Sequence, residues 1–167
     1  VGAINRTLSI MVGGHSKLFK RYLPLFNILG KTIIHIGENP GDGCYAKLAN
    51  QIMVSINLAS MSEALIFAKE VNIDIEKVRV ALLGGLASSE VLRVKYEKIK
   101  SDDFSPGGKI DINLKDLNYA SSIVNDLDLK LPFLNLVRIL YKKISDGGFG
   151  NNDHSYIIKE LQKYSKS

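Results

Sequence analysis

The chain has 167 residues, of which 46% are hydrophobic and 23% are charged, close to the average for a globular protein. This composition excludes a disordered chain, and the length allows a buried core without disulfides or metals. The net charge of +5 comes from scattered Lys and Arg, so a nucleic-acid tract is not expected. The single cysteine excludes a disulfide framework and a cysteine-based zinc site, and it fits a reducing, cytoplasmic compartment.

The first 37 residues predict a strand, a helix and a second strand. An apolar, β-branched run at 7–13 predicts the first strand. Apolar residues spaced by three and four predict a helix over 15–29, in which Pro24 is expected to cause a kink or a break. The run 32–36 predicts a short buried strand. This β-α-β order is typical of the edge of an α/β sheet.

A long helix is predicted from about Cys44 to Val71, with Asp42 as its N-cap. Apolar residues cover most of its circumference, which is typical of a helix buried on several sides. Polar residues interrupt this helix too often for a transmembrane span. They are Asn50, Gln51, Ser55, Asn57, Ser60, Ser62 and Glu63.

From residue 74 onward the pattern predicts only shorter helices, so the fold class is mainly α with a small β-α-β piece in front. The first of these helices is expected to begin after an N-cap at Asp74 and to end at Gly84-Gly85, and the second to begin after an N-cap at Ser88 or Ser89. A third helix is expected over about 112–127, and a fourth starts at Pro132. After a flexible break at Gly147-Gly148-Phe149-Gly150, the last helix is expected to begin after an N-cap at Asn152 or Asp153.

Lys47 is the first candidate for chemistry, because the helix dipole disfavours a cation near the start of a helix. Asn50 and Gln51 follow three and four positions later, so their side chains project from the same face. Two neutral amides can orient a substrate oxygen without neutralising the ammonium group, which suits proton transfer. On spacing alone a solvated lysine is the commoner situation, and carbonyl chemistry is the alternative.

Other candidate features are weaker. The turn Gly41-x-Gly43 would let a ligand approach the backbone, although such turns are common before helices. Lys115-Asp116 forms a second possible polar site, for which a solvated helix start is the alternative. The G-x-G-x-x-G fingerprint of dinucleotide-binding proteins does not occur after a strand in this sequence.

No chemical role is expected for the cysteine or the histidines. Cys44 has no partner for redox chemistry and is expected to be a packing residue. His35 lies in an apolar strand and is expected to be a hydrogen-bonded core residue, whereas His154 is expected to be exposed. With His15 these histidines are dispersed, so no metal site is predicted.

Several motifs occur in an order that covers essentially the whole chain. They are Thr7-Leu8-Ser9-Ile10-Met11-Val12-Gly13-Gly14, Gly41-x-Gly43-x-x-x-Lys47-Leu48-Ala49-Asn50-Gln51, Ser62-Glu63-Ala64-Leu65, Phe104-x-Pro106-Gly107, Lys115-Asp116-Leu117, Leu131-Pro132, Gly148-x-Gly150 and Asp153-His154-Ser155. This ordered set resembles the β-hydroxyacid dehydrogenase family of the 6-phosphogluconate dehydrogenase superfamily.

Within the family, the segment 47–51 and Gly84-Gly85-Leu86-Ala87 most resemble the branch that reduces tartronate semialdehyde (2-hydroxy-3-oxopropionate) to glycerate. The alternative is a branch that acts on 3-hydroxyisobutyrate or a related β-hydroxyacid. Members of the 3-hydroxyisobutyrate branch more often carry a second Asn where Gln51 stands.

The resemblance implies a two-domain oxidoreductase that uses NAD or NADP and a small hydroxy or oxo acid. Lys47 would be the general acid that protonates the aldehyde oxygen as hydride arrives, and the base in the reverse direction. The other implied site residues are Gly43, Asn50 and Gln51 for the substrate, and Phe104, Lys115 and Asp116 for the cofactor.

The resemblance also implies a domain organisation. Residues 1–37 would end an NAD(P)-binding α/β domain, 38–72 would form a loop and the interdomain helix, and 73–167 would form a helical substrate and dimerisation domain. The sequence opens without an initiator methionine and lacks the cofactor loop. We therefore expect the rest of the Rossmann domain to lie upstream and the 167-residue chain alone to be inactive.

Two further expectations concern the pocket and the partners. Gly108 stands where the family usually has Phe, so one wall of the pocket is expected to differ. The long apolar helix would expose surface that a Rossmann domain or a second subunit covers, so a homo-oligomer is expected, without a membrane or nucleic-acid partner. A helical oligomerisation module without activity is the alternative from another class of function.

Overall fold

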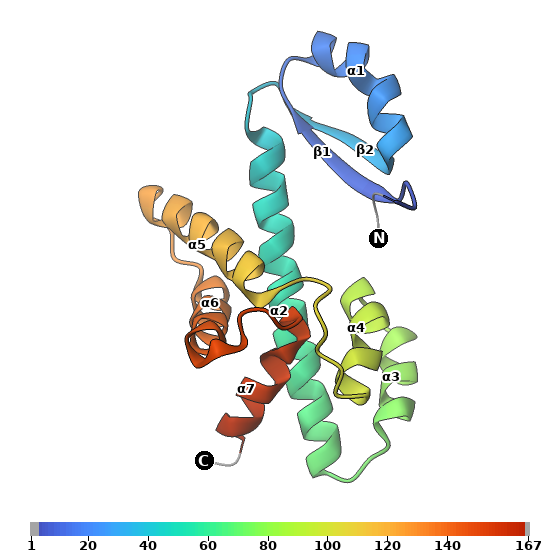
Figure 1. Cartoon of the computed structure of the whole chain (residues 1–167), viewed down its shortest axis with the longest axis vertical. Helices are drawn as coiled ribbons and strands as arrows, with labels where there is room; N and C mark the ends of the chain where they lie inside the picture. Colours follow the sequence, from blue (N-terminus) through green and yellow to red (C-terminus); the bar gives the residue numbers. More distant parts are fainter. Residues whose placement is uncertain (1–3, 166–167) are drawn as a thin grey trace. The chain divides into compact units, whose positions relative to one another are not determined.

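The computed structural model describes residues 4–165, which form two compact units, one up to Asn50 and one from Gln51 onward (Figure 1). The first unit contains β1 (Leu8–Gly13), α1 (Ser16–Leu29), β2 (Gly30–Gly37) and the start of α2 (Asp42–Glu70). The second unit contains the rest of α2 and α3 (Ile75–Leu83), α4 (Glu90–Lys100), α5 (Ile110–Asp126), α6 (Pro132–Ile144) and α7 (Ile157–Tyr164). The mainly α fold class with a β-α-β start is confirmed.

The first unit is a parallel pair of strands joined by a helix. β1 and β2 pair in parallel, with Ile10 opposite Ile33, and α1 provides the crossover that parallel strands require. Pro24 lies inside α1 without interrupting it, so the predicted break does not occur. The prediction of a buried second strand is wrong, because Ile34 and Ile36 are exposed in the described chain.

His35 has the structural role that the sequence predicts. Its Nε2 atom lies 2.6 Å from the carbonyl oxygen of Gly14, and its ring stacks on Phe19 with a centroid distance of 4.8 Å. These contacts connect β2 to the end of β1 and to α1.

The start of α2 lies against the end of β1. A Cβ atom at Gly43 would lie 2.3 Å from the carbonyl oxygen of Met11, so only glycine fits this approach. The prediction that Asp42 is the N-cap is wrong. Asp42 is already the first helical residue, and its carboxylate accepts from the backbone N–H of Asn39 in the preceding turn at 3.0 Å. Cys44 is exposed, so its predicted packing role is also wrong.

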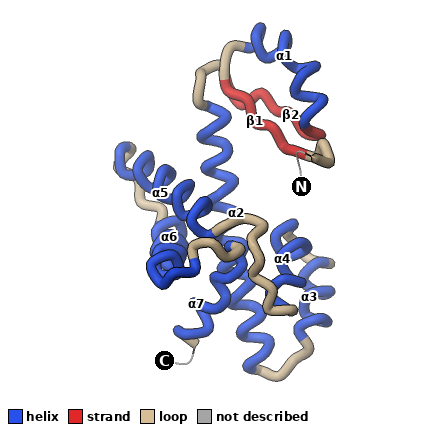
Figure 2. The backbone as a smooth tube through the Cα atoms, viewed as in Figure 1, coloured by secondary structure: helices blue, strands red, loops and turns tan. Residues whose placement is uncertain are grey.

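The second unit is built around α2. Figure 2 shows α3 and α4 on one side of this helix and α5, α6 and α7 on the other. α3 packs on α4, α5 packs on α6, and α6 packs on α7. The core consists of aliphatic side chains and two buried tyrosines; its largest fully buried members are Tyr96, Tyr141, Leu58, Leu65, Ile110, Leu117 and Ile157.

The circumference of α2 is only partly buried within this chain. Leu58 and Leu65 are fully buried, whereas Met53 and Phe67 are 67% and 65% exposed. Among the described residues α2 is the one helix that is long and apolar enough to cross a membrane, a test that core helices of soluble proteins also pass. The prediction against a membrane span therefore depends on its polar residues, two of which, Gln51 and Ser55, belong to a hydrogen-bond network with α5.

Helix boundaries in the second unit follow the predicted capping residues. Asp74 accepts from the N–H of Glu76, Ser89 accepts from the N–H of Leu92, and Asp153 accepts from the N–H of Ser155. The segment predicted as a flexible break instead forms a π-helical turn over Ser145–Phe149, in which Gly148 adopts a φ of 87°. That angle lies in the left-handed region that favours glycine.

Candidate active site

Helices α2 and α5 are connected by a polar network around Gln51. The Nε2 atom of Gln51 donates to Oδ2 of Asp116 at 3.0 Å and lies 3.5 Å from Oδ1 of Asn113. Asp116 also faces Lys115, whose Nζ lies 3.5 Å from Oδ1 of Asp116. The structure therefore brings together three of the predicted site residues: Gln51, Lys115 and Asp116.

Asp116 differs from Lys115 in its exposure to solvent. The Asp116 side chain is 17% exposed, whereas that of Lys115 is 60% exposed. The carboxylate is thus held between the two helices while the ammonium group extends outward, within 6.0 Å of the ring of Tyr119. This arrangement presents a cation that can contact a ligand beside an anchored carboxylate.

Buried groups behind Gln51 complete the network. The Ser55 hydroxyl donates to the backbone carbonyl of Gln51 at 2.7 Å and accepts from Nδ2 of Asn113 at 3.1 Å. The hydroxyl of Tyr141 donates to the carbonyl of His154 at 3.1 Å, and Asn113 lies near enough to influence its pKa. Burial raises the pKa of Tyr141 far above its ordinary value, so this hydroxyl stays protonated.

The remaining predicted substrate residues lie in the first unit. Lys47 is exposed and Asn50 is half-buried, and helical geometry places them one turn apart on α2. Gly43 has the packing role described above, against β1. Its assignment to the substrate stays a prediction, as do those of Lys47 and Asn50.

Phe104 packs on a different set of residues. Its ring meets Tyr156 edge to face at a centroid distance of 5.1 Å, and Nζ of Lys159 lies 5.6 Å from its centroid. The carbonyl of Phe104 accepts from the N–H of Asp153 at 2.9 Å. Phe104 thus belongs to an anchored loop, and its predicted contact with a cofactor stays a prediction.

The anchor of that loop is Asp153, a fully buried carboxylate. Its Oδ2 accepts from Nζ of Lys95 at 2.8 Å and from the N–H groups of Gly107 and Gly108 at 3.1 and 3.0 Å. Its Oδ1 accepts from the hydroxyl of Ser155 at 2.7 Å. Burial by itself would raise the pKa of Asp153, but these donors outweigh burial and hold the pKa well below its ordinary value.

His154 is not exposed as predicted, because its ring covers Gly108. A Cβ atom at Gly108 would lie 3.1 Å from Cε1 of His154, and the N–H of His154 donates to the carbonyl of Gly108 at 2.7 Å. Burial, together with the charge of Lys95, lowers the pKa of His154 to about 4. The imidazole thus stands against the position where the family usually has Phe.

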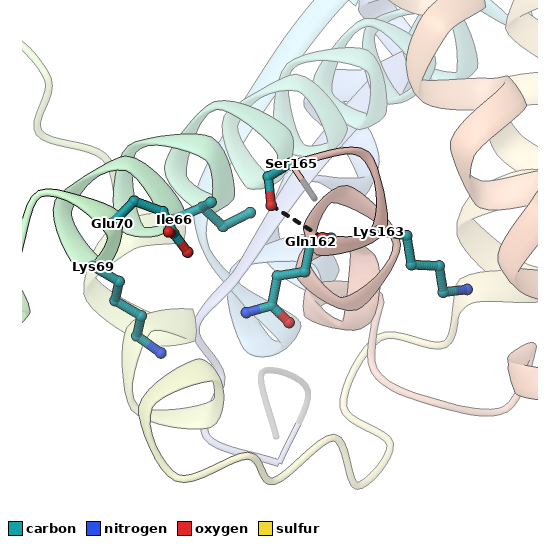
Figure 3. A pocket seen from close by; sticks show the side chains of 6 residues that line it. All are labelled: Ile66, Lys69, Glu70, Gln162, Lys163 and Ser165. Carbon is teal, nitrogen blue, oxygen red and sulfur yellow. Dashed lines mark hydrogen bonds between the residues drawn. The ribbon is translucent and has the colours of Figure 1, made fainter. Parts of the chain in front are cut away.

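A cavity of about 450 Å³ lies elsewhere in the second unit, between the last turns of α2 and α7 (Figure 3). Its lining residues are Ile66, Lys69, Glu70, Gln162, Lys163 and Ser165. Lys163 pairs with Glu160 at 2.6 Å, and the Ser165 hydroxyl donates to the carbonyl of Gln162. Ile66 lies 15 residues after Gln51, about 22 Å along the helix axis, so this cavity is separate from the polar network.

Sequence reasoning missed the roles of Ser55, Asn113, Lys95 and Asp153. Ser55 stands four residues after Gln51, and that spacing is the signal that puts the two side chains on one face of the helix. The capping pattern predicts the cap at Asp153, whereas its partner Lys95 is 58 residues away and no local pattern connects the two.

Comparisons with known proteins identify the family of the chain. The family model described as "NAD-binding of NADP-dependent 3-hydroxyisobutyrate dehydrogenase" matches residues 41–161, and the model "NAD binding domain of 6-phosphogluconate dehydrogenase" matches residues 1–37. The chain therefore belongs to the β-hydroxyacid dehydrogenase family, whose members are nicotinamide-dependent oxidoreductases.

One curated relative is particularly similar. The 2-hydroxy-3-oxopropionate reductase of Escherichia coli strain K12 is 43% identical over 162 residues, which are 97% of this chain and 55% of that protein. The chain thus spans about half the length of the curated relatives it matches.

Two solved structures share the fold. The 3-hydroxyisobutyrate dehydrogenase of Mycobacterium tuberculosis, solved with L-serine, superposes with a TM-score of 0.87 at 23% identity and covers 96% of this chain and 57% of that chain. The protein Psf3, solved with NADP+ and 2-OPP, superposes with a TM-score of 0.85 at 21% identity and covers 96% of this chain and 56% of that chain.

Proposed function

We propose that the chain is the C-terminal part of an oxidoreductase that reduces tartronate semialdehyde to glycerate with NADH or NADPH. The observation that carries the proposal is the 43% identity to a 2-hydroxy-3-oxopropionate reductase across 97% of this chain. The contact between Gln51 and Asp116 supports it, because two motifs 65 residues apart meet at 3.0 Å. The proposed setting is a cytoplasmic homo-oligomer.

In this proposal Lys47 moves the proton. Its ammonium group donates a proton to the aldehyde oxygen as the carbonyl carbon gains hydride, and the amine takes the proton back in the reverse direction. The amides of Asn50 and Gln51 hold the substrate, and the backbone at Gly43 lets it approach closely. Negative charge develops on the carbonyl oxygen, so a positioned cation lowers the barrier most at that atom.

The described residues fit one end of a nicotinamide dinucleotide. Lys115 offers an outward-facing cation beside the carboxylate of Asp116, which suits contacts with a carboxamide or sugar hydroxyl. Phe104 offers an aromatic ring on an anchored loop. When bound, the reduced nicotinamide supplies the hydride. Because the sequence contains no G-x-G-x-x-G loop after a strand, we expect no turnover from the 167 residues alone.

The test uses the protein expressed from its complete reading frame. The wild type should oxidise NADH or NADPH with tartronate semialdehyde more efficiently than it acts on 3-hydroxyisobutyrate. Lys47→Ala should lower kcat by about 10²–10⁴-fold with the fold intact by circular dichroism. Lys69→Ala, in the last turn of the same helix, is the matched control and should retain activity.

Several outcomes contradict the proposal. Full activity of Lys47→Ala would remove the lysine from the mechanism. Preference for 3-hydroxyisobutyrate would assign the chain to the sister branch, and turnover by the 167 residues alone would refute the predicted inactivity.

An association module is the second candidate function, favoured by one observation. Helix α6 buries Leu134, Val137 and Leu140 but exposes Phe133, Leu136 and Ile139 in the described chain. Exposed apolar side chains on one helix mark an association surface. Light scattering of the chain at high concentration tests it, since a clean monomer would count against this function.

A further inference from the structure

Gln51 on α2 contacts two residues of α5. Its Nε2 atom lies 3.0 Å from Oδ2 of Asp116 and 3.5 Å from Oδ1 of Asn113. Asn113 and Asp116 are three positions apart, so their side chains project from one face of α5. A carboxylate only accepts hydrogen bonds, so Gln51 is the donor in its contact with Asp116.

The part of α2 that carries this donor is fixed by buried groups. Ser55 and Asn113 are 0% and 2% exposed. The Ser55 hydroxyl donates to the backbone carbonyl of Gln51 at 2.7 Å and accepts from Nδ2 of Asn113 at 3.1 Å. Packing and hydrogen bonds around a side chain hold it in a defined position. Gln51 therefore reaches Asp116 from a fixed backbone.

The two oxygens of Asp116 have different partners. Oδ2 accepts from Gln51, whereas Oδ1 lies 3.5 Å from Nζ of Lys115. The Lys115 side chain is 60% exposed, and an exposed ion pair constrains its members weakly. The shorter contact, from the half-buried Gln51, is therefore the stronger constraint on the direction of the carboxylate.

We infer that Gln51 is a positioning residue for the nicotinamide cofactor, because it fixes the direction of the Asp116 carboxylate and thereby the place of the Lys115 ammonium group. The inference rests on the proposed function, in which Lys115 and Asp116 contact the cofactor. It gives Gln51 a role in cofactor affinity that requires no contact between Gln51 and the cofactor. Groups that are ordered before a ligand arrives lose less entropy when it binds.

The experiment uses the protein expressed from its complete reading frame and measures the Kd of NADH and of NADPH by calorimetry. No aldehyde is present, so a contact of Gln51 with the substrate has no influence on the result. Gln51→Met keeps the length of the side chain and removes the donor, and Gln51→Glu places a second carboxylate against Asp116. Gln162→Met, at the separate cavity beside α7, is the matched control.

The comparison is made for the cofactor that the wild type binds more tightly. Gln51→Met should raise its Kd about five- to tenfold, since a hydrogen bond to a charged group is lost. Gln51→Glu should raise it further, because like charges repel. Gln162→Met should stay within about twofold of wild type. A merely structural role of Gln51 would lower the urea midpoint and leave the Kd of the folded variants unchanged, and that result overturns the inference.

A double-mutant cycle tests whether Gln51 acts through Asp116. In an Asp116→Ala background, Gln51→Met should change the Kd by less than about twofold, because the group that Gln51 positions is gone. An effect as large as in the wild-type background means that Gln51 acts by another route, which overturns the inference. Should Asp116→Ala fail to fold, the order of the single variants decides, and equal Kd values for Gln51→Glu and Gln51→Met overturn it.

Failure of the proposed function gives a different result. A wild type that binds neither NADH nor NADPH overturns the inference together with the cofactor part of that function. If instead the wild type reduces tartronate semialdehyde while Gln51→Met keeps its cofactor affinity, the proposed function stands and only the role of Gln51 is overturned.

Discussion

Two carboxylates in the second unit, Asp153 and Asp116, illustrate opposite uses of the same side chain. Asp153 is fully buried and accepts from a lysine, a hydroxyl and three backbone N–H groups. Asp116 is partly exposed and is held by one amide and one neighbouring lysine. Both oxygens of Asp153 accept hydrogen bonds within the fold, whereas Asp116 has fewer donors and lies at the edge of the candidate site. The buried carboxylate with many hydrogen-bond donors anchors a loop, whereas the partly exposed carboxylate is the candidate for contact with a ligand.

The largest expected effect is on stability at the anchor. Asp153→Ala should lower the free energy of unfolding by about 3–5 kcal/mol, because it leaves the mostly buried Lys95 without its partner and removes the acceptor of the Gly107 and Gly108 N–H groups. Urea unfolding of the chain measures the change. Asp146→Ala, which breaks an exposed pair with Lys142, is the control and should cost less than about 1 kcal/mol. Equal effects of the two variants would refute the role of Asp153 as an anchor.

The second effect is a dependence on pH. The folded chain holds the pKa of His154 at about 4, below the ordinary 6.5, because burial disfavours the imidazolium. As the pH falls, the unfolded chain binds this proton before the folded chain does. The contribution of His154 to the free energy of unfolding is therefore fully present above pH about 6.5 and is lost toward pH about 4. We expect this group to account for about 2 kcal/mol of that loss, after a discount for its partial exposure.

His154→Phe, which cannot be protonated, tests this dependence. Between pH 7 and pH 4.5, the free energy of unfolding of this variant should fall by about 2 kcal/mol less than that of the wild type. Identical slopes for the two proteins would show that the His154 ring is not buried in solution.

The third effect concerns the loop that Asp153 holds. A Cβ atom at Gly107 would lie 2.8 Å from Oδ2 of Asp153, which cannot move away without breaking its bonds. Gly107→Ala should therefore cost about 1–3 kcal/mol of unfolding free energy. Gly85→Ala is the matched control, since its Cβ atom would lie no closer than 3.9 Å to the Ala81 carbonyl oxygen. A neutral Gly107→Ala would mean that the loop is not tightly held.

The smallest effect on stability is expected at the site. Asp116→Ala should cost about 1 kcal/mol or less in urea unfolding, because it removes one partly exposed hydrogen bond. The same variant should lower activity on tartronate semialdehyde in the protein from the complete reading frame. A destabilisation as large as that of Asp153→Ala would make Asp116 a second anchor and remove the contrast between the two carboxylates.

Local patterns in the sequence predicted much of this molecule. The β-α-β start, the long helix and the caps Asp74, Ser89 and Asp153 follow from hydrophobic spacing and from side chains that accept from nearby N–H groups. The wrong predictions are also local. The turn pattern predicts Asp42 as an N-cap outside a helix that in fact includes it, and the lack of a redox partner does not bury Cys44.

The candidate site was predicted in its residues but not in its connections. Motif spacing indicated Lys47, Asn50, Gln51, Lys115 and Asp116, and the domain boundaries at 37 and 72 also stay predictions. That Gln51 meets Asp116 could not be read from the sequence, because the two are 65 residues apart and the contact depends on how α5 crosses α2. Ser55 and Asn113 gained their roles from the same crossing.

By itself the sequence determined the family, the order of the elements and the residue types available for proton transfer, since these follow from short-range patterns and ordered motifs. Only the tertiary structure decided which polar groups form hydrogen bonds within the fold and which lie at the edge of the candidate site. The physical reason is that a hydrogen bond is directional and short-ranged, so the packing of α5 on α2 and of the 104–108 loop on Asp153 sets its partners.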